Sequence, residues 1–326
     1  MTHVHAIRMS ETGGPEVLRW QPIELPDPAP GEARVRHAAI GLNFVDTYHR
    51  TGLYPVALPA GLGSEAAGVV EAVGAGVTTV AKGDRVAYVS GPLGSYSEAR
   101  NIPVTYLVKL PADIDDVTAA AAMLKGMTAQ YLATRTYAVK KGDTILVHAA
   151  AGGVGLILCQ WAKHLGATVI GTVGSEAKAK LAREHGCDHV VFYRTEDVPA
   201  RVRAINGGVG VPVVYDSVGK DTFIASLDSL CPRGLMVSFG QSSGPIGPFD
   251  PRLLMQKGSL FFTRPTLGDY TRTRAELDAT AHDLFAVIRS GVVRIRAAQT
   301  VPLRDAERAH RDLEARKTTG STILIP

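Results

Sequence analysis

Cysteine is scarce in this sequence, whose 326 residues contain only Cys159, Cys187 and Cys231. The three stand far apart, with no Cys-x-x-Cys pair and no histidine at metal-ligand spacing, which disfavours both a disulfide framework and a cysteine-based zinc site. His3 and His5 form a lone i, i+2 pair, a pattern more typical of exposed side chains than of a metal site. The cysteine and histidine pattern therefore gives no indication of a bound metal.

Long hydrophobic runs and a strong net charge are also absent. No stretch approaches the roughly 18 uninterrupted apolar residues that cross a bilayer, and residues 1–20 contain no apolar segment of signal-peptide type. A formal net charge of +4 is too small for the strong positive field that attracts nucleic acid. We therefore expect a cytoplasmic protein with no membrane span, for which nucleic acid is not a partner.

The chain is longer than one hydrophobic core usually supports, so we expect two domains. In the first third, short β-branched runs alternate with Gly and Pro, which predicts strands at residues 33–40, 66–73, 84–89 and 106–109. From about residue 119, strands alternate with helical stretches, as in a parallel sheet with crossover helices. The predicted strands of this sheet are residues 144–149, 168–173, 189–193, 213–216, 235–240 and 259–263, enough for a doubly wound Rossmann sheet.

The pattern changes again after Pro265. Apolar residues at helical spacing predict a long helix that contains Leu277, Leu284 and Ile288. A strand at residues 299–302, a helix at 304–316 and a strand at 321–325 then indicate a return to the first domain.

A glycine-rich turn follows the first strand of the predicted Rossmann sheet. Residues 144–155 read Thr-Ile-Leu-Val-His-Ala-Ala-Ala-Gly-Gly-Val-Gly and lead into a helical segment at 156–165. Ala150 takes the first glycine position of the dinucleotide fingerprint, Gly152 would let the backbone approach a pyrophosphate, and Gly155 would let helix pack on strand. The helix N-terminus would offer free N–H groups to the anion. A plain strand-to-helix turn is the alternative.

The end of the next strand indicates which cofactor is bound. An NAD enzyme places a carboxylate there, whereas this sequence has Gly174 and Ser175, with Lys178 about one helical turn further on. The absence of a carboxylate favours NADPH. Two alternatives stay open: Glu176 could point at the ribose or complement the helix dipole, and Lys178 could be an ordinary solvated lysine.

Four segments carry a family resemblance: Val-His-Ala-Ala-Ala-Gly-Gly-Val-Gly at 147–155, Val-Tyr-Asp-Ser-Val-Gly-Lys at 214–220, Val-Ser-Phe-Gly-Gln-Ser-Ser-Gly at 237–244 and Leu-Phe-Phe-Thr-Arg-Pro at 260–265. They resemble quinone oxidoreductases of the zeta-crystallin type, in the non-zinc branch of the medium-chain dehydrogenase/reductase superfamily. The likeness runs from Gly-Gly-Pro-Glu-Val-Leu at 13–18 to Gly-Ser-Thr-Ile-Leu-Ile-Pro at 320–326, and so covers nearly the whole chain.

The resemblance implies an α/β fold of two domains. A GroES-like, strand-rich catalytic domain would comprise residues 1–124 and 268–326, a Rossmann NADPH-binding domain would comprise residues 125–267, and the active site would lie in the cleft between them. Family members are usually homodimers joined through edge strands, for which residues 259–263 are the candidate.

The resemblance also implies the residues that bind NADPH. Gly174, Lys178, Tyr193 and Arg316 match positions that carry the 2′-phosphate, although Arg316 could instead belong to a solvated helix face. Thr128 could bond only its own helix backbone. The complete predicted set is Lys125, Thr128, Ala151, Gly152, Gly153, Val154, Gly155, Gly174, Ser175, Lys178, Tyr193, Ser217, Phe239, Gly240, Gln241, Ser242, Phe262 and Arg316.

On the acceptor side, the resemblance points to Asn43, Asp46, Tyr48, Tyr54 and Ser64. Asn43 and Ser64 stand where zinc-dependent relatives have Cys and His, and both are poor zinc ligands, so no metal is expected. Asn43 and the tyrosine hydroxyls could donate hydrogen bonds to a quinone oxygen as it gains charge. Tyr48 is the first candidate, with half-buried packing as the alternative for either tyrosine.

These features predict a zinc-independent NADPH:quinone oxidoreductase that reduces quinones or other electron-poor acceptors. An NADPH-dependent alkenal or enone reductase shares the same fold, cofactor and metal-free chemistry and is the alternative. A cofactor-regulated RNA-binding or structural protein is the non-enzymatic alternative. The physiological acceptor, the number of electrons transferred per step and the general acid are left open.

Overall fold

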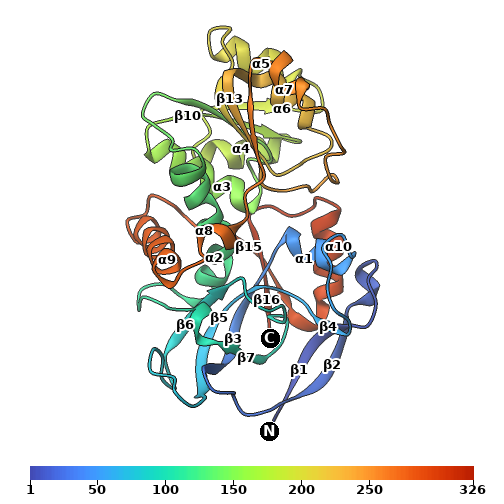
Figure 1. Ribbon diagram of the computed structural model, residues 1–326, viewed down its shortest axis with the longest axis vertical. Coiled ribbons are helices and arrows are strands. Elements are labelled where there is room, and N and C mark those ends of the chain that lie inside the picture. The colour runs from blue at the N-terminus through green and yellow to red at the C-terminus, as the bar shows by residue number, and fades with distance from the viewer. The chain divides into compact units, whose positions relative to one another are not determined.

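Both ends of the chain lie in the same structural unit (Figure 1). The structure, a computed structural model, describes residues 1–326 and divides them into two units. Unit 1 comprises Met1–Leu124 and Ile295–Pro326, and unit 2 comprises Lys125–Arg294. None of the helices combines the length and the apolar character needed to cross a bilayer.

Unit 1 is built on two β-sheets. One has seven strands in the order β15-β16-β3-β5-β6-β8, with β7 paired to β3, and the other has the order β2-β1-β4. The strands are β1 (Thr2–Met9), β2 (Arg19–Leu25), β3 (Glu32–Leu42), β4 (Ala60–Gly61), β5 (Glu65–Val73), β6 (Arg85–Val89), β7 (Ala99–Pro103), β8 (Leu107–Lys109), β15 (Ala297–Pro302) and β16 (Ser321–Ile325). The four strands predicted in the first third are confirmed as β3, β5, β6 and β8, whereas β1, β2, β4 and β7 were not predicted.

The helices of unit 1 are short. Helix α1 (Phe44–Arg50) follows β3, and α10 (Ala306–Glu314) lies between β15 and β16 in the sequence. The unit also contains the 3-10 turns η1 (Pro15–Val17), η2 (Val104–Tyr106) and η4 (Leu303–Asp305). Helix α2 (Asp116–Tyr131) begins in unit 1 and contains the boundary to unit 2.

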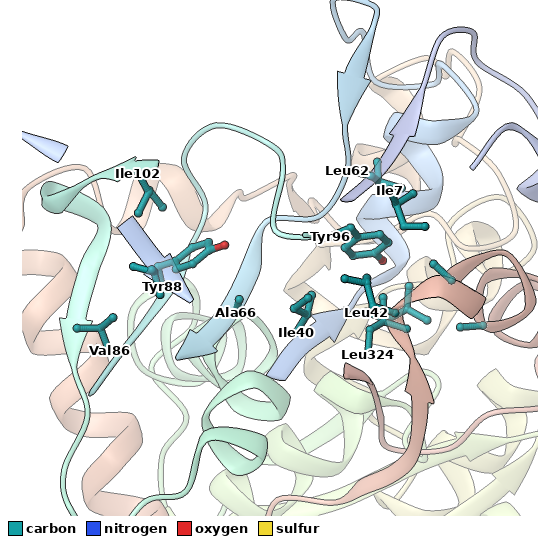
Figure 2. Close-up of a cluster of buried hydrophobic side chains, with 14 of the residues drawn as sticks. Ile7, Ile40, Leu42, Leu62, Ala66, Val86, Tyr88, Tyr96, Ile102 and Leu324 are labelled. Atoms are coloured by element: carbon teal, nitrogen blue, oxygen red, sulfur yellow. The ribbon is translucent and has the colours of Figure 1, made fainter. Parts of the chain in front are cut away.

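The core of unit 1 joins distant parts of the chain. Figure 2 shows Ile7 of β1, Ile40 of β3, Val86 of β6 and Leu324 of β16 in one buried cluster. Each aliphatic side chain of this size contributes about 1.5–3 kcal/mol when it is fully buried. Strand β16 also pairs antiparallel with β3, with Leu324 opposite Ile40. The carboxyl-terminal strand therefore fixes the end of β3, from which the chain enters the first candidate site residue, Asn43.

Unit 2 contains a six-stranded sheet in which every pair is parallel, in the order β11-β10-β9-β12-β13-β14. All six predicted strands are confirmed. The order reverses direction between β9 and β12, and in sheets of this kind ligands bind at the carboxyl ends of the strands beside such a point. The strands are β9 (Thr144–Val147), β10 (Thr168–Val173), β11 (His189–Phe192), β12 (Val211–Asp216), β13 (Leu230–Ser238) and β14 (Phe261–Thr263).

Helices connect the strands of unit 2, and several carry clear start signals. The Ser175 hydroxyl caps α4, the Asp197 carboxylate caps α5, and Thr273 with Glu276 forms a capping box at the start of α9. The helices are η3, a π-helical turn (Leu132–Thr136), α3 (Gly153–His164), α4 (Glu176–Glu184), α5 (Val198–Ile205), α6 (Phe223–Ser229), α7 (Arg252–Gln256), α8 (Leu267–Tyr270) and α9 (Arg274–Arg289).

The second boundary between the units differs from the prediction. It lies between Arg294 and Ile295, so residues 268–294, which were assigned to the first domain, belong to unit 2. The reason is that α9 packs on residues of unit 2: Asp283 accepts a hydrogen bond from Gln130 at 2.9 Å, and a side chain at Gly126 would collide with Leu284. The long helix was predicted correctly, but its partner could not be read from its own periodicity.

Candidate active site

The turn after β9 has the geometry of a dinucleotide-binding loop. Ala149 adopts a positive φ of 52°, a conformation that costs free energy in a residue with a Cβ atom, and Gly152 is the N-cap of α3 without any side-chain cap. A Cβ atom on Gly155 would lie 2.4 Å from the carbonyl oxygen of Ala149. The loop is therefore drawn tightly against the helix, and the first N–H groups of α3 have no capping side chain. This is a cradle that fits a pyrophosphate.

At the end of β10, the backbone is packed against an aromatic ring. A Cβ atom on Gly174 would lie 2.8 Å from the hydroxyl oxygen of Tyr193, so a larger residue here would displace the end of that side chain. Lys178 donates its backbone N–H to the Ser175 hydroxyl at 3.4 Å, which places the lysine in the first turn of α4. Glu176 is exposed in the same turn, where its charge complements the helix dipole. The structure therefore brings Gly174, Ser175, Lys178 and Tyr193 together.

The loops after β12 and β13 are tied to each other through the backbone. The N–H groups of Phe239 and Ser242 donate to the carbonyl oxygens of Asp216 and Ser217, at 2.8 and 3.1 Å. A Cβ atom on Gly240 would lie 2.7 Å from the Ser217 carbonyl oxygen. Five predicted residues, Ser217, Phe239, Gly240, Gln241 and Ser242, thus lie on two adjoining loops at the carboxyl edge of the sheet.

Phe262 lies in a different environment from these loop residues. Its ring packs against Phe223 and Phe249, with centroid distances of 6.2 and 5.5 Å. This aromatic cluster accounts for the side chain without a cofactor, and a direct role for Phe262 stays a prediction.

Lys125 and Thr128 lie on the part of α2 that belongs to unit 2, and both are buried. The Thr128 side chain lies near that of Tyr131, three positions further along the helix. Burial is the largest cause that raises the pKa of Tyr131. This tyrosine was not predicted as part of the site.

Arg316 lies in unit 1 and is not on a helix face. Helix α10 ends at Glu314, and Arg316 adopts a positive φ of 57° two residues later, with an exposed side chain. The predicted extension of the helix to residue 316 is therefore wrong. Glycine usually occupies this left-handed position at a helix end, so an arginine there holds a strained backbone conformation.

On the acceptor side, Asn43 and Asp46 form the start of α1. Asn43 is the N-cap and donates its backbone N–H to the Asp46 carboxylate at 2.8 Å. Its side-chain NH2 group makes a long contact of 3.4 Å with the Gly41 carbonyl oxygen, and its side-chain oxygen takes part in the capping box at the start of α1. The amide can therefore still donate to a ligand, whereas Asp46 holds the backbone that presents it.

Tyr48 and Tyr54 are in contact. Their rings meet edge to face at 5.2 Å, and His49 lies edge to face with Tyr54 at 5.6 Å. Ser64 follows Gly63 in unit 1, and its buried hydroxyl has no hydrogen-bond partner within the chain. A buried polar atom without a partner is costly unless a ligand or water completes its hydrogen bonding. Ser64 is therefore suited to contact a ligand oxygen.

A buried network that the sequence did not reveal supports Asp46. The Tyr96 hydroxyl donates to the Asp46 carboxylate at 2.9 Å and lies 3.2 Å from Nε2 of His310. Nδ1 of the same histidine accepts from Arg50, which also binds Glu314 through two hydrogen bonds of 3.0 and 2.6 Å. Burial and then the nearby Arg50 charge lower the pKa of His310 to about 3. Helix α10 thus holds the start of α1 through side chains alone.

No group of three or more His, Cys, Asp or Glu side chains is placed to hold a metal ion. His3 and His5 lie near Glu24 and Glu98, with side chains that are 78% and 48% exposed. The expectation of a metal-free site stays a prediction.

The strand-rich unit that contains both chain ends and the parallel sheet with its glycine-rich loop together define a class of protein, the medium-chain dehydrogenases/reductases. The family model for the alcohol dehydrogenase GroES-like domain matches residues 29–112, and the model for zinc-binding dehydrogenases matches residues 153–281. The predicted α/β fold, with GroES-like and Rossmann parts, is confirmed.

Within this class, the chain belongs to the quinone oxidoreductase family. It is 55% identical to a quinone oxidoreductase of Pseudomonas aeruginosa over 98% of this chain and 99% of that relative. A solved structure of Escherichia coli quinone oxidoreductase complexed with NADPH matches with a TM-score of 0.97 and 51% identity, over 99% of this chain and 100% of that chain. A 2-haloacrylate reductase of a Burkholderia species is 48% identical over 99% of both chains. The protein is therefore an oxidoreductase enzyme, as predicted.

Proposed function

We propose that the enzyme is a zinc-independent NADPH:quinone oxidoreductase. The observation that carries the choice of cofactor is the end of β10, where Gly174 packs against Tyr193 and the N-cap of α4 is Ser175 instead of a carboxylate. The E. coli relative solved with NADPH supports the same choice.

The residues of unit 2 fit the parts of a dinucleotide. The uncapped start of α3 and the close approach at Gly155 suit the pyrophosphate. Lys178 and Tyr193 would hold the 2′-phosphate as a cation and a hydroxyl donor, and Arg316 stays a predicted member of this set. NADPH, when bound, supplies the hydride.

The residues of unit 1 would serve the acceptor. A quinone that gains a hydride develops negative charge on an oxygen, which hydrogen-bond donors stabilise, and takes one proton to become a hydroquinone. The Asn43 amide and the unpartnered Ser64 hydroxyl are available donors, and we assign the tyrosine hydroxyls, Tyr48 first, to the same task. Asp46 cannot donate as a carboxylate, so its part is to position Asn43.

The steady-state test uses the purified enzyme with NADPH or NADH and a panel of ortho- and para-quinones, before and after dialysis against a strong zinc chelator. We expect a clear preference for NADPH and unchanged turnover after dialysis. Stoichiometric zinc that is lost together with turnover would contradict the metal-free chemistry, and equal use of NADH would contradict the cofactor assignment.

A second candidate is an NADPH-dependent reductase of enals, enones or related electron-poor alkenes. The 48% identity to a 2-haloacrylate reductase favours it, because such an acceptor also delocalises charge without a Lewis acid. The ratio of kcat/KM for quinones to kcat/KM for enals and 2-haloacrylate decides between the two, and we expect quinones to be preferred. A gel-shift experiment at physiological salt, for which we expect no complex, checks the RNA-binding alternative.

We further propose a cytoplasmic homodimer. Strand β14 is an edge of the six-stranded sheet and exposes Phe261, which is 61% accessible, so a second copy could extend the sheet there. Sedimentation of the wild type and of Phe261→Lys tests this: a dimer that the substitution converts to a monomer is expected, and a monomeric wild type would contradict it.

A further inference from the structure

Four polar side chains form a continuous buried chain inside unit 2. Oγ1 of Thr172 lies 3.0 Å from Nδ1 of His148, and Nε2 of this histidine lies 3.0 Å from Oγ of Ser226. The Ser226 hydroxyl in turn lies 2.7 Å from the Asp216 carboxylate. All four residues are at most 1% exposed.

The direction of each hydrogen bond follows from the donors available. Ser226 has one hydroxyl proton, and the 2.7 Å contact with a carboxylate requires it there, because two oxygens at this distance repel each other without a proton. Nε2 of His148 must then donate to Ser226, and Nδ1 accepts from Thr172. Burial lowers the pKa of His148, in keeping with this neutral form. All the bonds therefore run one way, towards Asp216.

Both ends of this chain of hydrogen-bonded side chains reach loops of the candidate cofactor site. At one end, Thr172 Oγ1 accepts the backbone N–H of Ala149 at 3.3 Å, in the strained turn of the glycine-rich loop. At the other end, the Asp216 carboxylate accepts the backbone N–H groups of Val218 and Gly219 at 2.7 and 3.0 Å. The loop that contains Gly240 and Ser242 is in turn hydrogen-bonded to residues 216 and 217. The four hydrogen-bonded side chains therefore connect all three loops.

The combination of Ser, His and Asp is not a hydrolytic triad. In such a triad the histidine lies between the other two residues, whereas here Ser226 lies between His148 and Asp216. Its hydroxyl is also completely buried and already donates to the carboxylate, so it cannot attack a substrate. A purely structural polar cluster would satisfy its own groups, but this one also holds backbone N–H groups of two separate ligand loops.

We propose that Thr172, His148 and Ser226 are positioning residues that fix the spacing between the glycine-rich loop and the loops after β12 and β13, and so set the affinity for NADPH. The inference rests on the proposed function, because it takes these loops to be the NADPH site. We assign none of these three side chains a contact with the cofactor.

The first test removes the Thr172 hydroxyl from the buried side-chain network. Thr172→Val keeps the shape of the side chain but leaves the Ala149 N–H and Nδ1 of His148 without a partner, so we expect the Kd for NADPH to rise about tenfold. Thr172→Ser restores the hydroxyl and should stay within about twofold of the wild type. In the cofactor-free protein, hydrogen exchange of the amides at residues 149–153 and 218–219 should accelerate in Thr172→Val and not in Thr172→Ser.

The second test removes the Ser226 hydroxyl, at the other end of the side-chain network. Ser226→Ala should also raise the Kd for NADPH about tenfold, and the double variant with Thr172→Val should be no more than about twofold worse than either single variant, because one continuous chain can be broken only once. Ser229→Ala is the matched control: Ser229 is equally buried on the same helix, but its hydroxyl bonds only the Ala225 carbonyl oxygen. It should leave the Kd within about twofold.

The outcomes separate the inference from the proposed function. If the wild type does not bind NADPH, the proposed function fails first. If the wild type binds NADPH but Thr172→Val binds it equally well, or if the two substitutions multiply to about a hundredfold, the inference is overturned and the proposed function stands. A fall in Tm of Thr172→Val with unchanged Kd and exchange would reduce the chain to a structural role.

Discussion

The candidate cofactor loops of unit 2 and the candidate acceptor residues of unit 1 are held in shape in different ways. In unit 2, the backbone shapes the candidate loops: Gly155 allows a contact with the Ala149 carbonyl oxygen that a Cβ atom would block, and Ala149 takes a left-handed conformation. In unit 1, the start of α1 depends on side chains, because Asp46 is held by Tyr96. Substitutions in unit 2 should therefore act on cofactor affinity, and those in unit 1 on stability and on the acceptor.

The largest effect is expected in the glycine-rich loop of unit 2, whose shape depends on the backbone. Gly155→Ala places a methyl group 2.4 Å from the Ala149 carbonyl oxygen, so loop and helix must move apart, and we expect the Kd for NADPH to rise more than about 100-fold. Gly247→Ala is the control, because a Cβ atom there meets nothing within 4 Å. Fluorescence titration with NADPH measures the Kd of both variants. Tight binding by Gly155→Ala would show that the backbone of unit 2 does not determine cofactor affinity.

The second largest effect is expected in unit 1, where side chains hold helix α1. Arg50 is 1% exposed, so Arg50→Ala leaves the buried Nδ1 of His310 and the partly exposed carboxylate of Glu314 without their donor, and we expect the enzyme to lose about 2 kcal/mol of stability with little change in the Kd for NADPH. Urea unfolding measures the loss. Arg311→Ala, on the same helix but with exposed ion pairs, should change stability little. An Arg50 variant as stable as the Arg311 variant would show that the network around Arg50 does not stabilise the enzyme.

Acid should act on unit 1 through two buried histidines. Burial is the first cause that lowers the pKa of both His37 and His310 from 6.5 to about 3. Between these values the unfolded chain binds protons that the folded chain does not, so stability falls as pH decreases from 6.5 towards 3, by up to about 1.4 kcal/mol per pH unit for each histidine.

Thermal unfolding over this pH range measures the effect. The variant His310→Gln should reduce the pH dependence and leave the part that His37 contributes, and a wild-type Tm that does not change with pH would contradict this expectation.

The smallest expected effect concerns the acceptor alone. Tyr48→Phe removes only a hydroxyl and keeps the edge-to-face contact with Tyr54, so we expect kcat/KM for a quinone to fall about fivefold while the Kd for NADPH is unchanged. The corresponding variant Tyr54→Phe ranks the two hydroxyls. Unchanged quinone kinetics in Tyr48→Phe would take this residue out of the mechanism.

The same contrast explains what the sequence could predict. The six strands of unit 2 and the loop at Gly152 and Gly155 were predicted because local patterns of apolar residues and glycine determine them. Strand β2 was missed because most of its side chains are at least partly exposed and it contains Pro22, so it lacks the alternation of a half-buried strand.

Partners that are distant in the sequence were also missed. Tyr96 and His310 are 214 positions apart, and neither carries a local motif. The chain through Thr172 and Ser226 is of the same kind: each residue reads as an ordinary strand or helix position, and only the fold brings them together.

The end of β10 should select NADPH over NADH, a claim that the substitution Lys178→Ala tests. We expect the Kd for NADPH to rise about tenfold, because one charge-assisted contact to the 2′-phosphate is lost, and the Kd for NADH to stay within about twofold, because NADH has no such phosphate. Titration of both cofactors into the wild type and the variant gives the four values required. Equal weakening of NADPH and NADH would show that Lys178 only supports its helix and would contradict the claim.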